Sequence, residues 1–153
     1  MSNTPSPPPA TEDERKALLG KRFTAALIDG FVCLVIVAAL GIIHQRIGAL
    51  GGALYILAKD GLDLPFMKGR SFGKQVLKIH PVPLSGGSMD LAASASRNIT
   101  LALPSIAFVV SGGFIYFILS IICFVIVAGE LYLVVTRFNG QRIGDQLANT
   151  EVR

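Results

Sequence analysis

Two carboxylic acids, Asp29 and Glu130, lie inside long apolar stretches of this 153-residue chain. A charge within a bilayer-crossing run costs roughly 2.5–3.5 kcal/mol to insert, so it usually faces other helices and often has a function. Each acid lies seven residues from an arginine, Arg22 or Arg137, that marks the end of its stretch. In two helices of opposite direction, this spacing puts both carboxylates about 10 Å below the same membrane surface.

Arg97 stands at the start of the apolar run that begins at Ile99, at the same membrane level, so the side chains of Asp29, Glu130 and Arg97 could meet in one cavity. In a first interpretation, Asp29 and Glu130 bind or exchange a cation or a proton, because paired carboxylates can share a proton. In a second, each acid pairs with an arginine or a backbone donor, and the network fixes helix register. In a third, Glu130 is protonated and faces lipid or a wet cavity without a partner. All three stay open, and they make Asp29, Glu130 and Arg97 the candidates for ligand or ion binding.

The composition indicates an integral membrane protein of one domain. Hydrophobic residues make up 52% of the chain and charged residues only 16%, with a mean hydropathy of +0.59. The formal charge is +4, but the cations flank apolar runs, which suits orientation in a bilayer and contact with anionic lipids rather than nucleic acid. The common catalytic and nucleotide-binding motifs are missing, and the two histidines and two cysteines lack metal-ligand spacing. We therefore expect no enzyme activity, no metal and no cofactor.

The apolar stretches predict an all-α bundle whose helices run over about 23–43, 47–58, 94–110 and 114–136. The turn Ser111-Gly112-Gly113 divides an apolar run too long for one ordinary crossing. Four crossings place the N-terminus, the 59–97 loop and the C-terminus, which hold nearly all the cations, on one side. The distribution of Lys and Arg therefore favours four transmembrane helices over three, in the cell membrane and with both termini cytoplasmic.

Two segments outside these helices have a distinct pattern. Residues 1–13 are rich in Pro, Ser and Thr, which predicts a disordered tail ahead of a membrane domain over 20–153. Phe72, Val76 and Ile79 recur at helical spacing with Lys74 between them. This pattern predicts a short amphipathic helix on the cytoplasmic membrane surface.

Small residues predict where the helices pack closely. Gly48 and Gly52 form a GxxxG pair in the second helix, and Ala25, Ala26, Gly30 and Cys33 lie near Asp29 in the first. Such faces let a second helix approach. In the C-terminal segment, Ile143 and Leu147 are expected to dock on the cytoplasmic face of the bundle.

Four motifs in this order resemble those of the RDD family of small bacterial membrane proteins. They are RFTAALID (22–29), GRSFGKQVLKI (69–79), SRNI (96–99) and RIGDQLANTEV (142–152). The resemblance implies a polytopic helical bundle with a role in transport, and cation/proton antiport in some members. It also implies that Asp145 is the second family aspartate. Because Asp145 is expected near the level of Arg22, a clasp between these two residues is a structural hypothesis.

Two classes of function follow from these observations. The first is transport of a small ligand or monovalent cation, including cation/proton exchange, with Asp29 at the site. The alternative is a non-transporting scaffold or accessory subunit that packs on a partner through its glycine-rich faces. Four short helices enclose little space, so transport would need a homo-oligomer or a partner membrane subunit.

Overall fold

The computed structural model describes residues 12–84, 86, 88–136 and 141–152 of the chain. It is mostly helical, at 72%. In chain order the elements are α1 (Glu12–Gly41), α2 (Gln45–Ala58), α3 (Phe72–Val76), β1 (Pro81–Pro83), α4 (Leu91–Val110), α5 (Gly113–Thr136), α6 (Ile143–Leu147) and β2 (Thr150–Val152). The predicted tail over 1–11 lies outside the described residues, while Glu12 and Asp13, also expected in that tail, begin α1.

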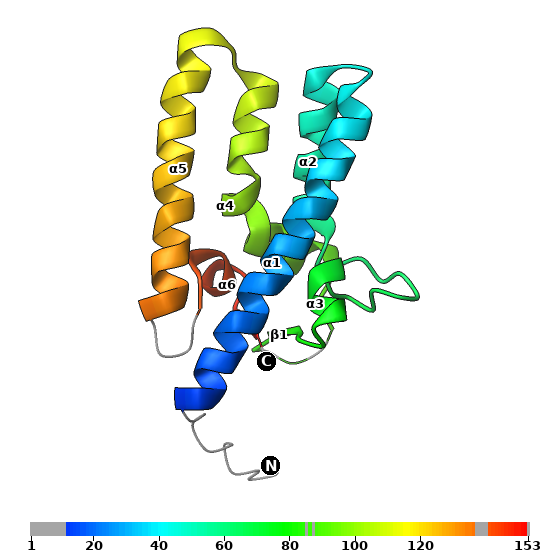
Figure 1. The fold of residues 1–153 in the computed structure, drawn as a ribbon, viewed down its shortest axis with the longest axis vertical. Coiled ribbons are helices and arrows are strands. Elements are labelled where there is room, and N and C mark those ends of the chain that lie inside the picture. Colours follow the sequence, from blue (N-terminus) through cyan, green and yellow to red (C-terminus); the bar gives the residue numbers. More distant parts are fainter. Residues whose placement is uncertain (1–11, 85, 87, 137–140, 153) are drawn as a thin grey trace.

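The four longer helices form two antiparallel hairpins, α1–α2 and α4–α5 (Figure 1). α2 packs on both α1 and α4, and α5 packs on α4. The short helices α3 and α6 and the strands lie at the end where α1 begins (Figure 1). β1 and β2 pair antiparallel, with Val82 opposite Glu151, so the all-α prediction was wrong for these two segments. This pairing ties the loop before α4 to the end of the chain.

Local signals explain where the helices start. Asp90 caps α4, because its side chain accepts a hydrogen bond from the amide of Ala93 at 2.7 Å. α5 begins at Gly113, whose φ of +55° suits glycine in the tight turn between α4 and α5. The predicted starts of these two helices, at 94 and 114, lie within three residues of the observed starts at Leu91 and Gly113.

Glycines let α2 lie against the backbone of α1. A Cβ at Gly48 would lie 2.5 Å from the carbonyl oxygen of Val37, and one at Gly52 would lie 2.6 Å from the Val37 side chain. Neither position has room for a side chain, so the predicted GxxxG packing face is confirmed.

The small-residue face predicted around Asp29 on α1 is only partly right. Ala25 and Asp29, one turn apart, are buried, whereas Ala26 and Gly30 are exposed. Ala25 and Asp29 are buried because α2 and α3 both pack on the side of α1 that carries them, whereas no helix in the described part of the chain covers Ala26 and Gly30.

Among the described residues, α1, α4 and α5 are long and apolar enough to cross a membrane. Their large apolar side chains are widely exposed, with Phe31 at 66% on α1 and Phe124 at 73% on α5, as lipid contact requires. α2 has 14 residues and so extends about 21 Å, short of a ~30 Å hydrocarbon core. The chain is thus a helical membrane protein, and crossing by α2 remains a prediction.

We expect the two connections between paired helices to lie on the side opposite the C-terminal segment. In a background with Cys33→Ala and Cys123→Ala, single cysteines at Ile43, Gly112 and Leu147 would be labelled in sealed vesicles with an impermeant maleimide. The exposed positions 43 and 112 should react from one side and 147 from the other. Reaction of 43 and 147 from the same side would show that α2 does not complete a crossing.

Candidate functional site

Asp29 on α1 is buried, with 3% of its surface exposed, and it joins α1 to two other helices. Its carboxylate lies 3.2 Å from Lys59 Nζ, after the end of α2, and accepts a hydrogen bond from the Gly73 amide in α3 at 2.7 Å. The hydroxyl of Tyr55 on α2 lies 3.5 Å away. A Cβ at Gly73 would collide with the Ala25 carbonyl, so only glycine lets this amide reach the acid.

Glu130 on α5 joins that helix to α4 and α6. Its Oε1 accepts hydrogen bonds from Thr100 Oγ1 at 2.9 Å and from the Gly144 amide at 3.0 Å. Its Oε2 lies 3.6 Å from Arg142 Nε. A Cβ at Gly144 would collide with the Arg97 carbonyl, so α6 also packs backbone against backbone. Glu130 therefore has partners, unlike in the third interpretation.

Asp145 in α6 is fully buried and lies among three arginines. Arg97 Nε on α4 lies 2.8 Å from its carboxylate, Arg22 Nη2 on α1 lies 3.0 Å away, and Arg142 donates its backbone amide at 3.1 Å. Burial opposes ionisation, but Arg97, Arg142 and Arg22 together hold the pKa of Asp145 below its usual range. Arg22 and Asp145, expected to form a clasp, thus lie in direct contact, with two further arginines.

Asp60 is a second fully buried acid, and sequence reasoning missed it. Lys74 Nζ lies 2.5 Å and 2.6 Å from its two carboxylate oxygens, and Asn98 Nδ2 donates to it at 3.2 Å. Arg97 Nε lies 3.7 Å away, so Arg97 stands between Asp60 and Asp145. Burial favours the neutral acid, but Lys74, Arg97 and Lys59 hold the pKa of Asp60 far below its ordinary value.

The short helix predicted around Lys74 exists, and its place on the membrane surface stays a prediction, but Lys74 itself is buried rather than on an exposed polar face. α3 exposes Phe72 at 41% and Val76 at 53% while it buries Lys74 at 9%. The physical reason is the buried carboxylate of Asp60, which is costly without a cation beside it, so the Lys74 side chain points inward to pair with it. One signal in the sequence could have indicated this pairing. Lys74 stands next to a glycine, in a segment that follows the first two apolar stretches and their polar end at Lys59-Asp60.

The prediction that Ile143 and Leu147 dock α6 on the bundle was wrong, because both side chains are exposed. Leu147 is 62% exposed and Ile143 is 38% exposed, whereas Gly144 and Asp145 between them are buried. α6 is held by the ion pairs of Asp145 and by the Gly144 amide on Glu130, not by its apolar side chains.

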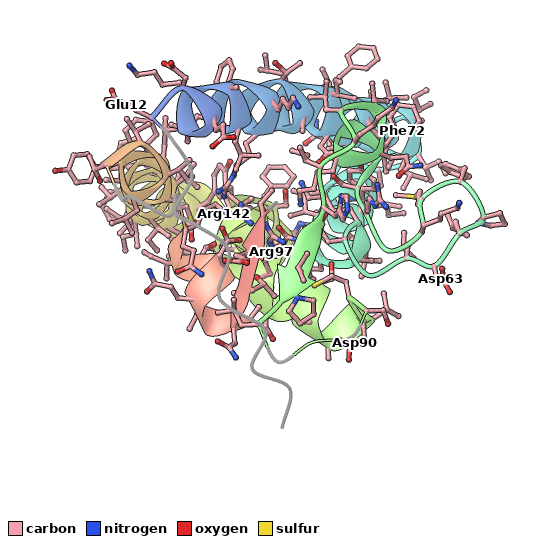
Figure 2. All side chains as sticks on the ribbon, turned by 90° about the horizontal axis from the view of Figure 1, so that it is seen from below. Glu12, Asp63, Phe72, Asp90, Arg97 and Arg142 are labelled. Carbon is pink, nitrogen blue, oxygen red and sulfur yellow. The ribbon has the colours of Figure 1, made fainter. Side chains whose placement is uncertain are left out.

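Nine charged side chains belong to what we call the ion-pair network. Its cations are Arg22, Lys59, Lys74, Arg97 and Arg142, and its carboxylates are Asp29, Asp60, Glu130 and Asp145. Figure 2 shows Arg97 and Arg142 close to the middle of the molecule, below α1. Every carboxylate of the network lies within 4 Å of at least one cation, which is the arrangement of the second interpretation.

A cavity of about 620 Å³ lies beside this network. Asp29 and Glu130 both line it, together with all five cations of the network. Its other walls are apolar side chains of α1, α4 and α5, among them Phe23, Leu101 and Val134. The two acids thus share a cavity, but the hydrogen bonds of each go to separate partners. Arg97 pairs with Asp145 and Asp60 rather than with either of them.

Replacement of Asp60 by Asn should destabilise the protein strongly. The change leaves Lys74 as a buried charge without its carboxylate and removes one of the two carboxylates beside Arg97, which costs about 3–5 kcal/mol. The matched control is Asp63→Asn three residues away, where the side chain is exposed. Thermal unfolding of both variants in detergent would measure the difference. Equal melting temperatures would contradict a structural role for the network.

Arg22→Gln should cost about 2 kcal/mol, because it removes one charged hydrogen bond to a buried carboxylate. Its control is Lys21→Gln, an exposed neighbour on the same helix turn that should unfold like the wild type. Asp145→Asn should be more harmful than Arg22→Gln, because it removes the counterion of three arginines. The reverse order would show that Arg22 acts independently of Asp145.

Comparison with known proteins places the chain in a family. No curated protein and no solved structure matches it at a significant level. The model of the RDD family matches residues 16–149, which contain Arg22, Asp29 and Asp145 and all of α1, α2, α4 and α5 except the first residues of α1. The resemblance noted from the four motifs is thereby confirmed, and the chain belongs to the RDD family.

Proposed function

We propose that this membrane protein takes up a small ligand in the cavity between α1, α4 and α5 and transports it. The observation that carries the proposal is the cavity itself, which is lined by the three helices long enough to span a membrane and by the charged groups of the network. A volume of about 620 Å³ lies within the roughly 300–1,000 Å³ range of small-molecule pockets. Charged groups at such depth are expensive, which is why they tend to mark a substrate path.

The charges favour a ligand that is not a monovalent cation. Asp29 has Lys59 at 3.2 Å, and Glu130 has Arg142 at 3.6 Å. A sodium or potassium ion at either acid would have to displace a lysine or arginine and leave it buried without a partner. Cation/proton exchange at Asp29 is therefore the weaker form of the transport proposal.

A non-transporting scaffold or accessory subunit is the second candidate. It is favoured by the pairing of all four carboxylates in the network, which suits a structural role. It is also favoured by the outer face of α5, where Phe117 and Phe124 are more than half exposed and available to a second membrane helix.

Access to the cavity from both sides of the membrane separates these functions. A cysteine at Ala26, which lines the cavity, should react with an impermeant methanethiosulfonate in both right-side-out and inverted vesicles, because transport requires alternating access. The matched control is Leu27→Cys, next in the chain but outside the cavity and 59% exposed toward lipid, which should react from neither side. Reaction of the Ala26 position from one side alone would favour the scaffold.

Ion flux in liposomes tests the cation alternative. Under imposed Na⁺, K⁺ or pH gradients, we expect no flux above that of empty liposomes, because the acids are already paired. The comparison is Asp29→Asn. A Na⁺ or K⁺ flux in the wild type that this variant abolishes would overturn the preference and establish cation exchange at Asp29.

A further inference from the structure

Among the residues that the structure describes, the ion-pair network has one more cation than carboxylates, if all nine groups carry their ordinary charges. The positive charge at its centre is buried, since Arg97 is 1% exposed and the side chain of Arg142 is 15% exposed. An uncompensated charge in such a place costs several kcal/mol unless a counterion joins it. All five cations line the cavity, so a counterion bound there would reach them.

Two buried polar atoms at the cavity point to the chemistry of that counterion. Arg97 Nη1, a donor, and Glu130 Oε2, an acceptor, have no hydrogen-bond partner among the residues that the structure describes. Both side chains are at least nine-tenths buried, and both line the cavity. Groups of this kind are nearly always satisfied in proteins, by the chain or by what it binds. A ligand that satisfies both must carry a hydrogen-bond acceptor and a donor, and the excess positive charge favours an anionic oxygen as the acceptor; a hydroxyl supplies the donor without adding charge.

The cavity walls add an apolar part to this ligand. Leu101 on α4 and Val127 and Val134 on α5 form one wall. Phe23 on α1 and Leu131 on α5 also line the cavity and are 59% and 57% exposed, so it opens between these helices toward the surrounding lipid. An acyl chain from the bilayer can enter by this route while its headgroup stays at the level of Arg22.

We propose that the cavity binds an anionic phospholipid whose headgroup has a single negative charge on its phosphodiester and a free hydroxyl. The phosphate oxygens accept hydrogen bonds from Arg97 Nη1 and neutralise the excess cation, and the hydroxyl donates to Glu130 Oε2. Arginine suits this role, because its planar donors match phosphate oxygens. The inference rests on the proposed function in one respect, namely that this cavity is the ligand site, and it names the ligand class.

Binding of defined lipids to the full chain tests the proposal. The purified protein in non-ionic detergent would be titrated with dioleoyl phosphatidylglycerol, phosphatidylmethanol or phosphatidylcholine, and separately with inorganic phosphate, and followed by native mass spectrometry. Phosphatidylglycerol should bind most tightly, phosphatidylmethanol less because it lacks the hydroxyl, and phosphatidylcholine at least tenfold less than phosphatidylglycerol because its net charge is zero. Equal binding of phosphatidylglycerol and phosphatidylcholine would overturn the proposal. Equal binding of phosphatidylglycerol and phosphatidylmethanol would show that the headgroup hydroxyl does not contribute to binding. Inorganic phosphate that binds as well as the lipid would show that the site takes free phosphate rather than a phospholipid.

Variants place the lipid in the cavity. Arg97→Lys keeps the charge but loses Nη1, so phosphatidylglycerol should bind about ten- to a hundredfold more weakly. Because this variant risks misfolding, Val134→Trp provides a second test, since it fills the cavity from its wall. Its control is Val125→Trp, nine residues away on the opposite, exposed face of α5, which should bind like the wild type. Equal binding in Val134→Trp and Val125→Trp would show that lipid adheres to the outer surface.

The result is separable from that of the transport test. Loss of lipid preference together with two-sided reaction at the Ala26 position would refute the ligand class and leave transport intact. Lipid binding with one-sided reaction would support the ligand class and refute transport.

Discussion

Arg97 is the side chain on which most of the structure depends. It lies 2.8 Å from Asp145 and 3.7 Å from Asp60, and so it connects α4 with α6 on one side and with the end of α2 on the other. Two fully buried carboxylates in an apolar bundle are tolerable only with cations beside them. The remaining ion pairs extend from this centre, through Lys74 to α3 and through Arg22 to α1.

The same requirement explains the glycines at the end of the bundle where α1 begins. Gly73 and Gly144 each pack against a backbone carbonyl that a side chain would strike, and each donates its amide to a buried acid. The charges therefore specify where the backbone of α3 and α6 must lie, and the glycines make those positions accessible. Short helices of five residues would have little stability by themselves, so the network is what places them.

The cavity is a consequence of this construction. α1 is held through α2 and α3, and α5 through α4 and α6, and the cavity lies between α1 and α5 beside the network. A set of charged groups beside apolar walls is suited to a ligand that is itself amphipathic. The exposed apolar faces of α1 and α5 are suited to lipid, as the composition of the whole chain requires.

The sequence by itself determined the membrane class and the α1–α2 packing through Gly48 and Gly52, because these depend on local apolar length and on residue size. It also predicted the ends of the long helices to within a few residues, except the start of α1, which lies at Glu12 rather than near 23 because the helix continues beyond the apolar run. It also singled out Asp29, Glu130, Arg97 and Arg22, since an ionisable residue beside or within an apolar run is conspicuous, whereas Asp145 was identified only through the resemblance to the family. It did not reveal Asp60 or Lys74, which lie in a polar stretch where charges look solvated. Apart from the Arg22–Asp145 clasp, only the tertiary structure decided which cation meets which acid. Partners such as Lys59 and Asp29 are brought together by the packing of the helices, and residue types alone do not encode that choice.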